Sequence, residues 1–322
     1  MKLDLDLLKR LLVIDHPSKQ EYPMISFIIN ECYKINGLEF EMDSYNNIFI
    51  TKNTTDPDFY GAVICHMDCV LPHANKNVNI KNGVIYGKDT KTGKRIGLGA
   101  DDAVGVCIAL HLLKVIPNLK VCFTTEEEIG FLGATEAAEN LEFWFNVSYM
   151  MQADRRGTSD LITQTNGIYS ASEEWLKEMT FIAAKYKYSE EWGIGTDVGE
   201  LAGLLGISGV NLSCGYTKEH TDKESTDINA VQNCLNFMEE ILLTVPTDKQ
   251  YTIDVRYFPY NYNYYSKKYS TDNYDMRDYI ADDCPKDDDP YDYRKDEYYE
   301  LPCDHCRDFD CMNCTKWDNY GG

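Results

Sequence analysis

Residues 61–67 form a nearly uninterrupted apolar run that carries His66 near its end and is followed by Asp68. A short strand this apolar is typical of a sheet that is covered on both faces. Side chains two residues apart on a strand point the same way, so His66 and Asp68 emerge together. A His-x-Asp pair alone is more often structural than functional, and its meaning depends on what the rest of the chain brings to it.

Strand-like and helix-like segments alternate along the first three quarters of the chain. This alternation predicts an α/β fold, a three-layer α/β/α sandwich around a mostly parallel mixed sheet. Ser18 is expected to cap the second helix, and Asn82-Gly83 predicts a short hairpin. Helices are expected at 4–14, 18–34, 103–116, 131–139, 196–205 and 225–244, a hairpin at 37–52, and strands at 61–67, 119–125, 147–153 and 209–213.

The net charge and the hydropathy of the chain exclude some classes of function. The chain carries 53 acidic and 31 basic residues, for a net charge of −22. Nucleic-acid binding needs clustered Lys and Arg, so we expect no nucleic-acid partner. No run approaches the ~20 apolar residues of a membrane span, and Asp4 and Asp6 interrupt what would be a secretory leader. We therefore expect a cytoplasmic protein whose twelve cysteines are reduced thiols or metal ligands rather than disulfides.

The composition changes near Pro246. From Tyr251 onward tyrosine and aspartate dominate, and aliphatic residues nearly vanish. Such a segment lacks the apolar residues to form its own core. We expect a catalytic domain over 1–246 and an acidic tail over 247–322 that is ordered only where it docks, with an unidentified protein as one candidate partner.

The tail contains two C-x2-C pairs separated by four residues. Four thiolates are a zinc ligand set, although the gap is much shorter than the ~15–20 residues usual in zinc ribbons. A small zinc knuckle at 303–314, free thiols and, less favoured, an iron–sulfur site stay open as interpretations. The residues concerned are Cys303, Cys306, Cys311 and Cys314.

Acidic residues and a second histidine follow the other predicted strands or precede a helix. Taken singly, each has an ordinary explanation, such as a helix cap for Asp101 or a solvated turn for Glu126-Glu127-Glu128. In an open α/β sheet, however, the carboxyl ends of the strands share one rim, where ligand sites form. We therefore expect His66, Asp101, the Glu127–Glu128 pair, Asp154 and His220 to converge.

This set matches the needs of a two-metal centre. Two divalent ions about 3.5–4 Å apart require a bridging carboxylate and further imidazole and carboxylate ligands. Mixed His and carboxylate ligands suit zinc, and also cobalt or manganese. A carboxylate beside the ligands can take a proton from the attacking water, and adjacent Glu127 and Glu128 can divide these tasks.

The chain resembles the superfamily of co-catalytic di-zinc exopeptidases, which includes peptidase T, the aminoacylases and the single-domain leucyl aminopeptidases. The resemblance covers roughly residues 5–245, and Gly195-Thr196-Asp197 is similar to a stretch near the peptidase T active site. The other motifs that carry it are Cys65-His66-Met67-Asp68, residues 99–105, Thr125-Glu126-Glu127-Glu128-Ile129-Gly130, Ala153-Asp154 and residues 215–220.

The resemblance implies a role for each matched residue. His66 and Asp154 would hold one zinc ion, Glu128 and His220 the other, and Asp101 would bridge them. Glu127 would activate a metal-bridging water as general base, and Asp68 would orient His66. Thr196 and Asp197 would lie near the substrate. Two residues are left over, Asp102 as a helix cap and Glu126 as a solvated acid.

One departure from the family bears on the substrate. Peptidase T and the aminoacylases insert a lid or dimerisation domain between the fourth and fifth ligands, but the chain from Asp154 to Gly195 is too short for one. We therefore favour an aminopeptidase acting on short peptides or aminoacyl compounds. A carboxypeptidase or N-acyl-amino-acid deacylase on the same site, and an inactive relative that serves as a binding protein, stay open.

Overall fold

The computed structural model describes residues 2–71 and 75–254, which belong to one compact unit. The four tail cysteines and most of the predicted tail lie outside the described residues. Residues 247–254 of the predicted tail are described, and they pack against the domain. Tyr251 is buried beside Tyr149 and Trp175, and Thr252 pairs with Ile207. The boundary expected at residue 246 stays a prediction.

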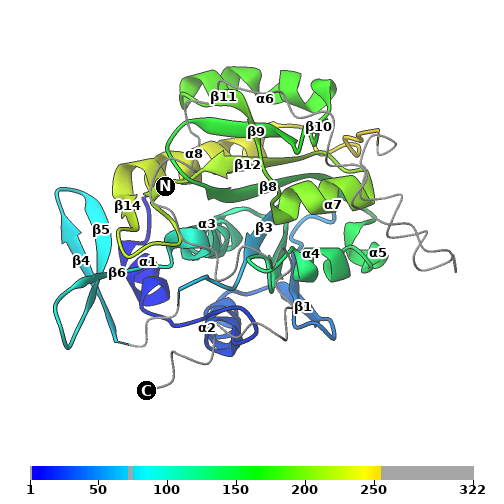
Figure 1. The fold of residues 1–322 in the computed structure, drawn as a ribbon. Coiled ribbons are helices and arrows are strands. Elements are labelled where there is room, and N and C mark those ends of the chain that lie inside the picture. The colour runs from blue at the N-terminus through cyan, green and yellow to red at the C-terminus, as the bar shows by residue number, and fades with distance from the viewer. Residues whose placement is uncertain (1, 72–74, 255–322) are drawn as a thin grey trace, which may run out of the picture. The chain divides into compact units, whose positions relative to one another are not determined.

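A nine-stranded mixed sheet forms the centre of this unit (Figure 1). Its four central strands, in the order β7, β3, β8 and β12, run parallel, and antiparallel pairs flank them. This confirms the predicted α/β fold. The strands are β1 (Leu38–Met42), β2 (Ile48–Lys52), β3 (Tyr60–His66), β7 (Leu119–Thr124), β8 (Val147–Arg155), β9 (Asp160–Thr165), β10 (Ile168–Tyr169), β11 (Ser189–Gly193) and β12 (Gly209–Ser213).

Helices cover both faces of the sheet, as the all-apolar central strands require. Alternate residues of β3 enter opposite cores, Val63 and Cys65 on one face and Ala62 and Ile64 on the other. The first core also holds side chains of α1 (Leu5–Leu12), α2 (Tyr22–Cys32), α3 (Ala100–Val115), α6 (Glu173–Lys185) and α8 (Ile228–Thr244). The second holds those of α4 (Leu132–Ala137), α5 (Leu141–Trp144) and α7 (Asp197–Leu205).

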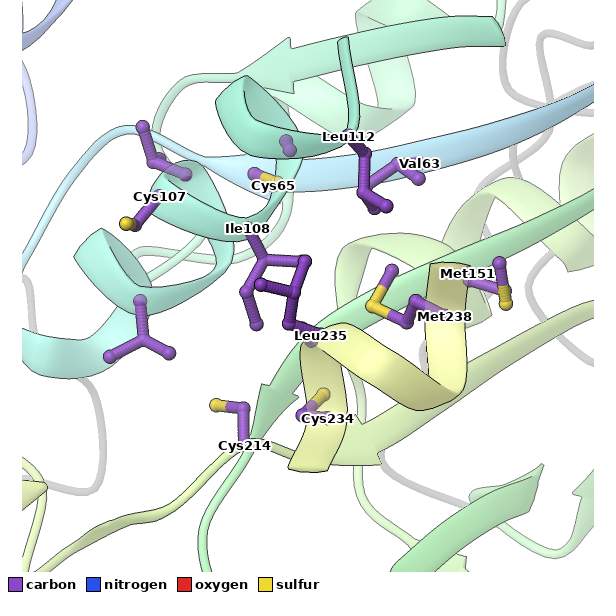
Figure 2. Packing of buried hydrophobic residues seen from close by; sticks show 14 of the residues in the cluster. Val63, Cys65, Cys107, Ile108, Leu112, Met151, Cys214, Cys234, Leu235 and Met238 are labelled. Carbon is purple, nitrogen blue, oxygen red and sulfur yellow. The ribbon is translucent and has the colours of Figure 1, made fainter. Parts of the chain in front are cut away.

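The larger core is rich in sulfur as well as in aliphatic side chains. Figure 2 shows Ile108 of α3 beside Leu235 of α8, together with cysteines and methionines of the same core. All seven cysteines in the described part of the chain are free and buried. Burial raises the pKa of the Cys32 and Cys234 thiols to about 12, so they behave as small apolar side chains. For these seven, the expectation of thiols instead of disulfides is confirmed.

A small second sheet lies beside the start of α3. It contains the predicted hairpin at Asn82-Gly83 and two short strands that precede α8. The prediction that the last helix begins at Ser225 was wrong, because Ser225–Asp227 pairs with a distant strand and Asp227 then caps the helix. The strands are β4 (Lys76–Lys81), β5 (Val84–Asp89), β6 (Arg95–Ile96), β13 (Tyr216–Thr217) and β14 (Ser225–Asp227).

One further difference from the sequence predictions, and the structure of one connecting segment, bear on the site. Helix α2 begins at Tyr22 rather than Ser18, and the Ser18 hydroxyl donates instead to Asp68 at 2.6 Å. The segment between Asp154 and Gly195 forms β9, β10, α6 and β11, and its strands extend the central sheet. Within the described residues, no helix is long and apolar enough to cross a membrane.

Candidate metal centre

The sheet topology brings the predicted residues to one edge. The parallel strands β3, β7 and β8 end together, with His66 paired to Thr124 and Ile64 to Gln152. His66 and Asp154 therefore stand at neighbouring strand ends, and Glu127 and Glu128 follow β7 directly. His220 lies in the loop between β13 and β14, and Asp101 lies at the start of α3.

Asp101 lies between two groups of side chains. Its Oδ1 atom is 2.9 Å from His66 Nε2, and that nitrogen is 3.6 Å from Asp154 Oδ1. Its Oδ2 atom is 3.3 Å from His220 Nε2, which is 3.0 Å from Glu128 Oε1. The two oxygens of one carboxylate thus face two separate pairs, each made of an imidazole and a carboxylate.

Asp68 supports this arrangement from behind His66. Its Oδ1 atom is 3.3 Å from His66 Nδ1, whose second contact is the Asp68 backbone oxygen at 3.0 Å. The same carboxylate accepts hydrogen bonds from Ser18 and from the backbone N–H groups of Glu127 and Glu128 at 3.0 and 3.2 Å. These donors and His66 lower the pKa of Asp68 although burial opposes ionisation. A charged acceptor on Nδ1 leaves Nε2 to face Asp101.

The crowding of carboxylates is the strongest argument that this edge takes a cation. Burial raises the pKa of Asp154 to about 8, with the Asp101 charge adding to the effect, and burial also raises the pKa of Glu128. Ligand atoms of His66, Asp101 and Glu128 lie within 4.8 Å of one another. Two imidazoles and several carboxylates are a donor set that fits zinc and related divalent ions, whose charge would offset this repulsion.

Glu127 and Glu126 have different surroundings. The nearby charges of Asp154 and Glu128 reinforce the effect of burial, which raises the pKa of Glu127 well above its usual value. Glu126 points elsewhere, and its Oε2 atom accepts a hydrogen bond from Tyr45 at 3.1 Å. Glu126 is only half-buried, but this contact shows that it is not simply solvated as the sequence suggested.

Asp102 fills the role expected of a helix cap and also contacts the site. Its Oδ1 atom accepts from the backbone N–H of Gly105 at 2.9 Å, and its Oδ2 atom accepts from that of His66 at 3.3 Å. A side chain at Gly105 would overlap the Asp102 carboxylate. Glycine at this position therefore leaves room for the Asp102 carboxylate, which also accepts from the end of β3.

Thr196 and Asp197 lie at the start of α7 and are buried, Asp197 completely. The Thr124 hydroxyl hydrogen-bonds both Asp197 Oδ2 and the Cys65 carbonyl oxygen. A single hydroxyl proton serves only one acceptor, so the arrangement is complete when Asp197 itself carries a proton. Burial raises the pKa of Asp197 to about 7, in keeping with this. Contact of these two residues with a substrate stays a prediction.

Sequence reasoning missed two residues that hold the candidate ligands. The Tyr216 hydroxyl donates to Asp154 Oδ1 at 2.9 Å, and Gln152 Nε2 donates to its Oδ2 atom at 3.1 Å. Gln152 precedes Asp154 by two residues on β8, so strand alternation was a usable signal. Tyr216 gave none, because its contact joins residues 62 positions apart.

No protein-family model and no curated protein sequence matches this chain. Solved structures do resemble it. Aminopeptidase PepT from Bacillus cereus has a TM-score of 0.65 and 16% identity, and the match covers 74% of this chain and 96% of that one. A tripeptidase from Staphylococcus aureus has a TM-score of 0.61 and 18% identity, with the same coverage. A TET aminopeptidase from a marine sediment thaumarchaeon has a TM-score of 0.60 and 12% identity, and the match covers 76% of this chain and 97% of that one. The chain therefore has the α/β fold found in these peptidases.

Proposed function

We propose that this protein is a metal-dependent aminopeptidase that removes residues from the free amino end of short peptides. The observation that carries the proposal is the Asp101 carboxylate, whose two oxygens face His66 with Asp154 on one side and His220 with Glu128 on the other. The fold shared with peptidases supports it, and so does the resemblance of these residues to the motifs of the co-catalytic di-zinc exopeptidases.

Two zinc ions are the proposed cofactor, with cobalt or manganese as substitutes. His66, Asp154 and Asp101 would hold one ion, and Asp101, Glu128 and His220 the other. When bound, such a pair polarises the scissile carbonyl and makes water a nucleophile at neutral pH. The chain's other nearby groups would then serve proton transfer and support.

Glu127 is the proposed general base. It adjoins the ligand Glu128, and its backbone is fixed by Asp68 at 3.0 Å. Its carboxylate would take the proton of the attacking water and return it to the departing amine. Asp68 would hold the His66 ring with Nε2 toward the metal, as carboxylates that accept the other ring N–H of metal-binding histidines commonly do.

The segment from Asp154 to Gly195 supports an aminopeptidase without a lid. Its strands belong to the central sheet, and α6 packs in the larger core, so it contributes no separate domain. Lid domains of this superfamily bind the far end of the substrate. A chain without one is better suited to recognising the free amine alone. The free buried thiols support a cytoplasmic location.

The test compares two substrates and two variants. Zinc-loaded protein is expected to hydrolyse leucine anilide and to leave its N-acetylated form intact; the reverse preference would favour a deacylase, and no hydrolysis of either would contradict the proposal. Glu127→Gln should reduce turnover by about 10²–10⁴-fold while zinc content is unchanged. The matched control is Glu126→Gln, one residue away and bonded to Tyr45, which should keep near wild-type turnover.

A further inference from the structure

Glu224 makes an unusual set of contacts for a residue in a polar loop. Its Oε2 atom accepts hydrogen bonds from the backbone N–H groups of Leu98 and Gly99, both at 2.7 Å. Its Oε1 atom accepts from those of Ala100 and Asp101, at 2.7 and 3.3 Å. One side chain, 3% exposed, thus binds four consecutive peptide groups.

Leu98 and Gly99 precede α3, and Ala100 and Asp101 open it, where backbone N–H groups have no partner within the helix. The residue at the N-cap position is Gly99, which has no side chain to cap them and adopts a left-handed conformation with φ of 69°. Asp101 and Asp102 have non-helical φ/ψ, and Asp102 caps the regular helix that follows them. Glu224 binds the N–H groups ahead of this point, from 123 residues away. Its negative charge also suits the positive end of the helix.

The cap joins the two loops that carry candidate ligands. Glu224 lies four residues after His220, and its own N–H bonds to the Thr221 carbonyl in the same loop. On the other side it holds the backbone of Asp101, whose Oδ2 atom is 3.3 Å from His220 Nε2. Arg95 adds to the connection by donating to the Lys223 and Glu224 carbonyls at 2.9 and 3.0 Å.

We propose that Glu224 is a positioning residue that fixes the spacing between Asp101 and His220, and so sets the affinity for a divalent ion bound between them. This inference rests on the proposed function only in taking these two residues as ligands. Glu224 is not a ligand in this scheme. It acts on the site through the backbone of the loop at 98–101.

The central test is zinc affinity in Glu224→Gln. The amide keeps one acceptor oxygen but turns an NH2 group toward two of the four backbone donors, so half of the cap is lost. We expect the weaker-bound zinc ion to lose at least tenfold in affinity, measured by competition with a chelator, as for other supports of metal ligands. Glu224→Asp, which keeps the charge but shortens the reach, should fall between this variant and the wild type.

The matched control is Asp4→Ala, which removes a carboxylate cap at the start of α1, where Asp4 accepts from the Leu7 N–H at 2.9 Å. Asp4→Ala should lower thermal stability without changing zinc affinity. A second measurement uses metal-free protein: amide hydrogens at 98–101 should exchange at least tenfold faster in Glu224→Gln and at the wild-type rate in Asp4→Ala.

Two results would overturn the inference. One is unchanged zinc affinity in Glu224→Gln, and the other is a loss of affinity in Asp4→Ala as large as in Glu224→Gln. If the wild type binds zinc but leaves aminoacyl anilides intact, the proposed function fails, and the zinc affinities still decide the role of Glu224. A wild type that binds no zinc would contradict both proposals, whatever the exchange rates at 98–101.

Discussion

Replacing Asp68 by asparagine tests whether the Asp68 carboxylate orients His66 or is only a buried side chain. The Asp68 carboxylate accepts from Glu127 N–H and faces His66 Nδ1 through one oxygen, and accepts from Ser18 and Glu128 N–H through the other. It is fully buried, so water cannot replace a lost acceptor. Asparagine has the same shape but offers one acceptor oxygen and two donor hydrogens.

The cost follows from the donors that face each oxygen. The Ser18 hydroxyl can reverse and accept, so the favourable orientation places the NH2 group beside Ser18 and Glu128 and leaves the Glu128 N–H without an acceptor. A buried unsatisfied donor costs about 1–3 kcal/mol. Where this cost destabilises the metal-bound state, it lowers zinc affinity by roughly fivefold to a hundredfold, at about 1.4 kcal/mol per tenfold change.

We therefore expect Asp68→Asn to bind zinc about 5–100-fold more weakly, as measured by chelator competition. The control is Ser18→Ala, which removes one neutral donor to the same carboxylate and leaves its other partners in place; its affinity should change by less than about fivefold. Wild-type zinc affinity in Asp68→Asn would refute the view that Asp68 holds His66 and the Glu127–Glu128 backbone in place.

Three further predictions concern stability and metal dependence. Burial lowers the pKa of His16 to about 4, so this buried imidazole is neutral, and its contribution to stability is complete above pH 6.5 and is lost as pH falls toward 4. Between pH 6.5 and 5 the unfolding free energy of the wild type, from denaturant titrations, should therefore fall by about 2 kcal/mol more than that of His16→Asn. The same pH dependence in both proteins would contradict this. Gly133→Ala places a methyl group 2.6 Å from Thr125 N and 2.8 Å from Asn47 Oδ1, so the unfolding free energy should fall by about 1–3 kcal/mol. An unchanged denaturant midpoint of unfolding would exclude the predicted overlap. Chelation should abolish hydrolysis of leucine anilide and added zinc should restore it, whereas activity that survives complete metal removal would rule out the metal mechanism.

Much of the fold could be predicted because burial leaves a direct mark on sequence. The run at 61–67 is apolar on both faces since β3 enters two cores, and this alone places His66 at a strand end. The rule that parallel strands share a carboxyl edge then predicted that His66 and Asp154 would meet, and their contact at 3.6 Å follows.

The features that sequence reasoning missed depend on partners far along the chain. Ser225–Asp227 continues into a helical pattern, and its pairing with β5 decides that it is a strand. Ser18 looks like a helix cap, but α2 begins only at Tyr22, and the Ser18 hydroxyl donates to Asp68, 50 residues away. Glu224 looks like one more solvated acid, since nothing local reveals the four N–H groups at 98–101.

The central claim is that Asp101 bridges two metal ions, and anomalous diffraction from crystals grown with zinc tests it most directly. We predict two zinc peaks on opposite sides of the Asp101 carboxylate, one beside His66 and Asp154 and the other beside Glu128 and His220. A single peak, or peaks that lie away from Asp101, would contradict the account.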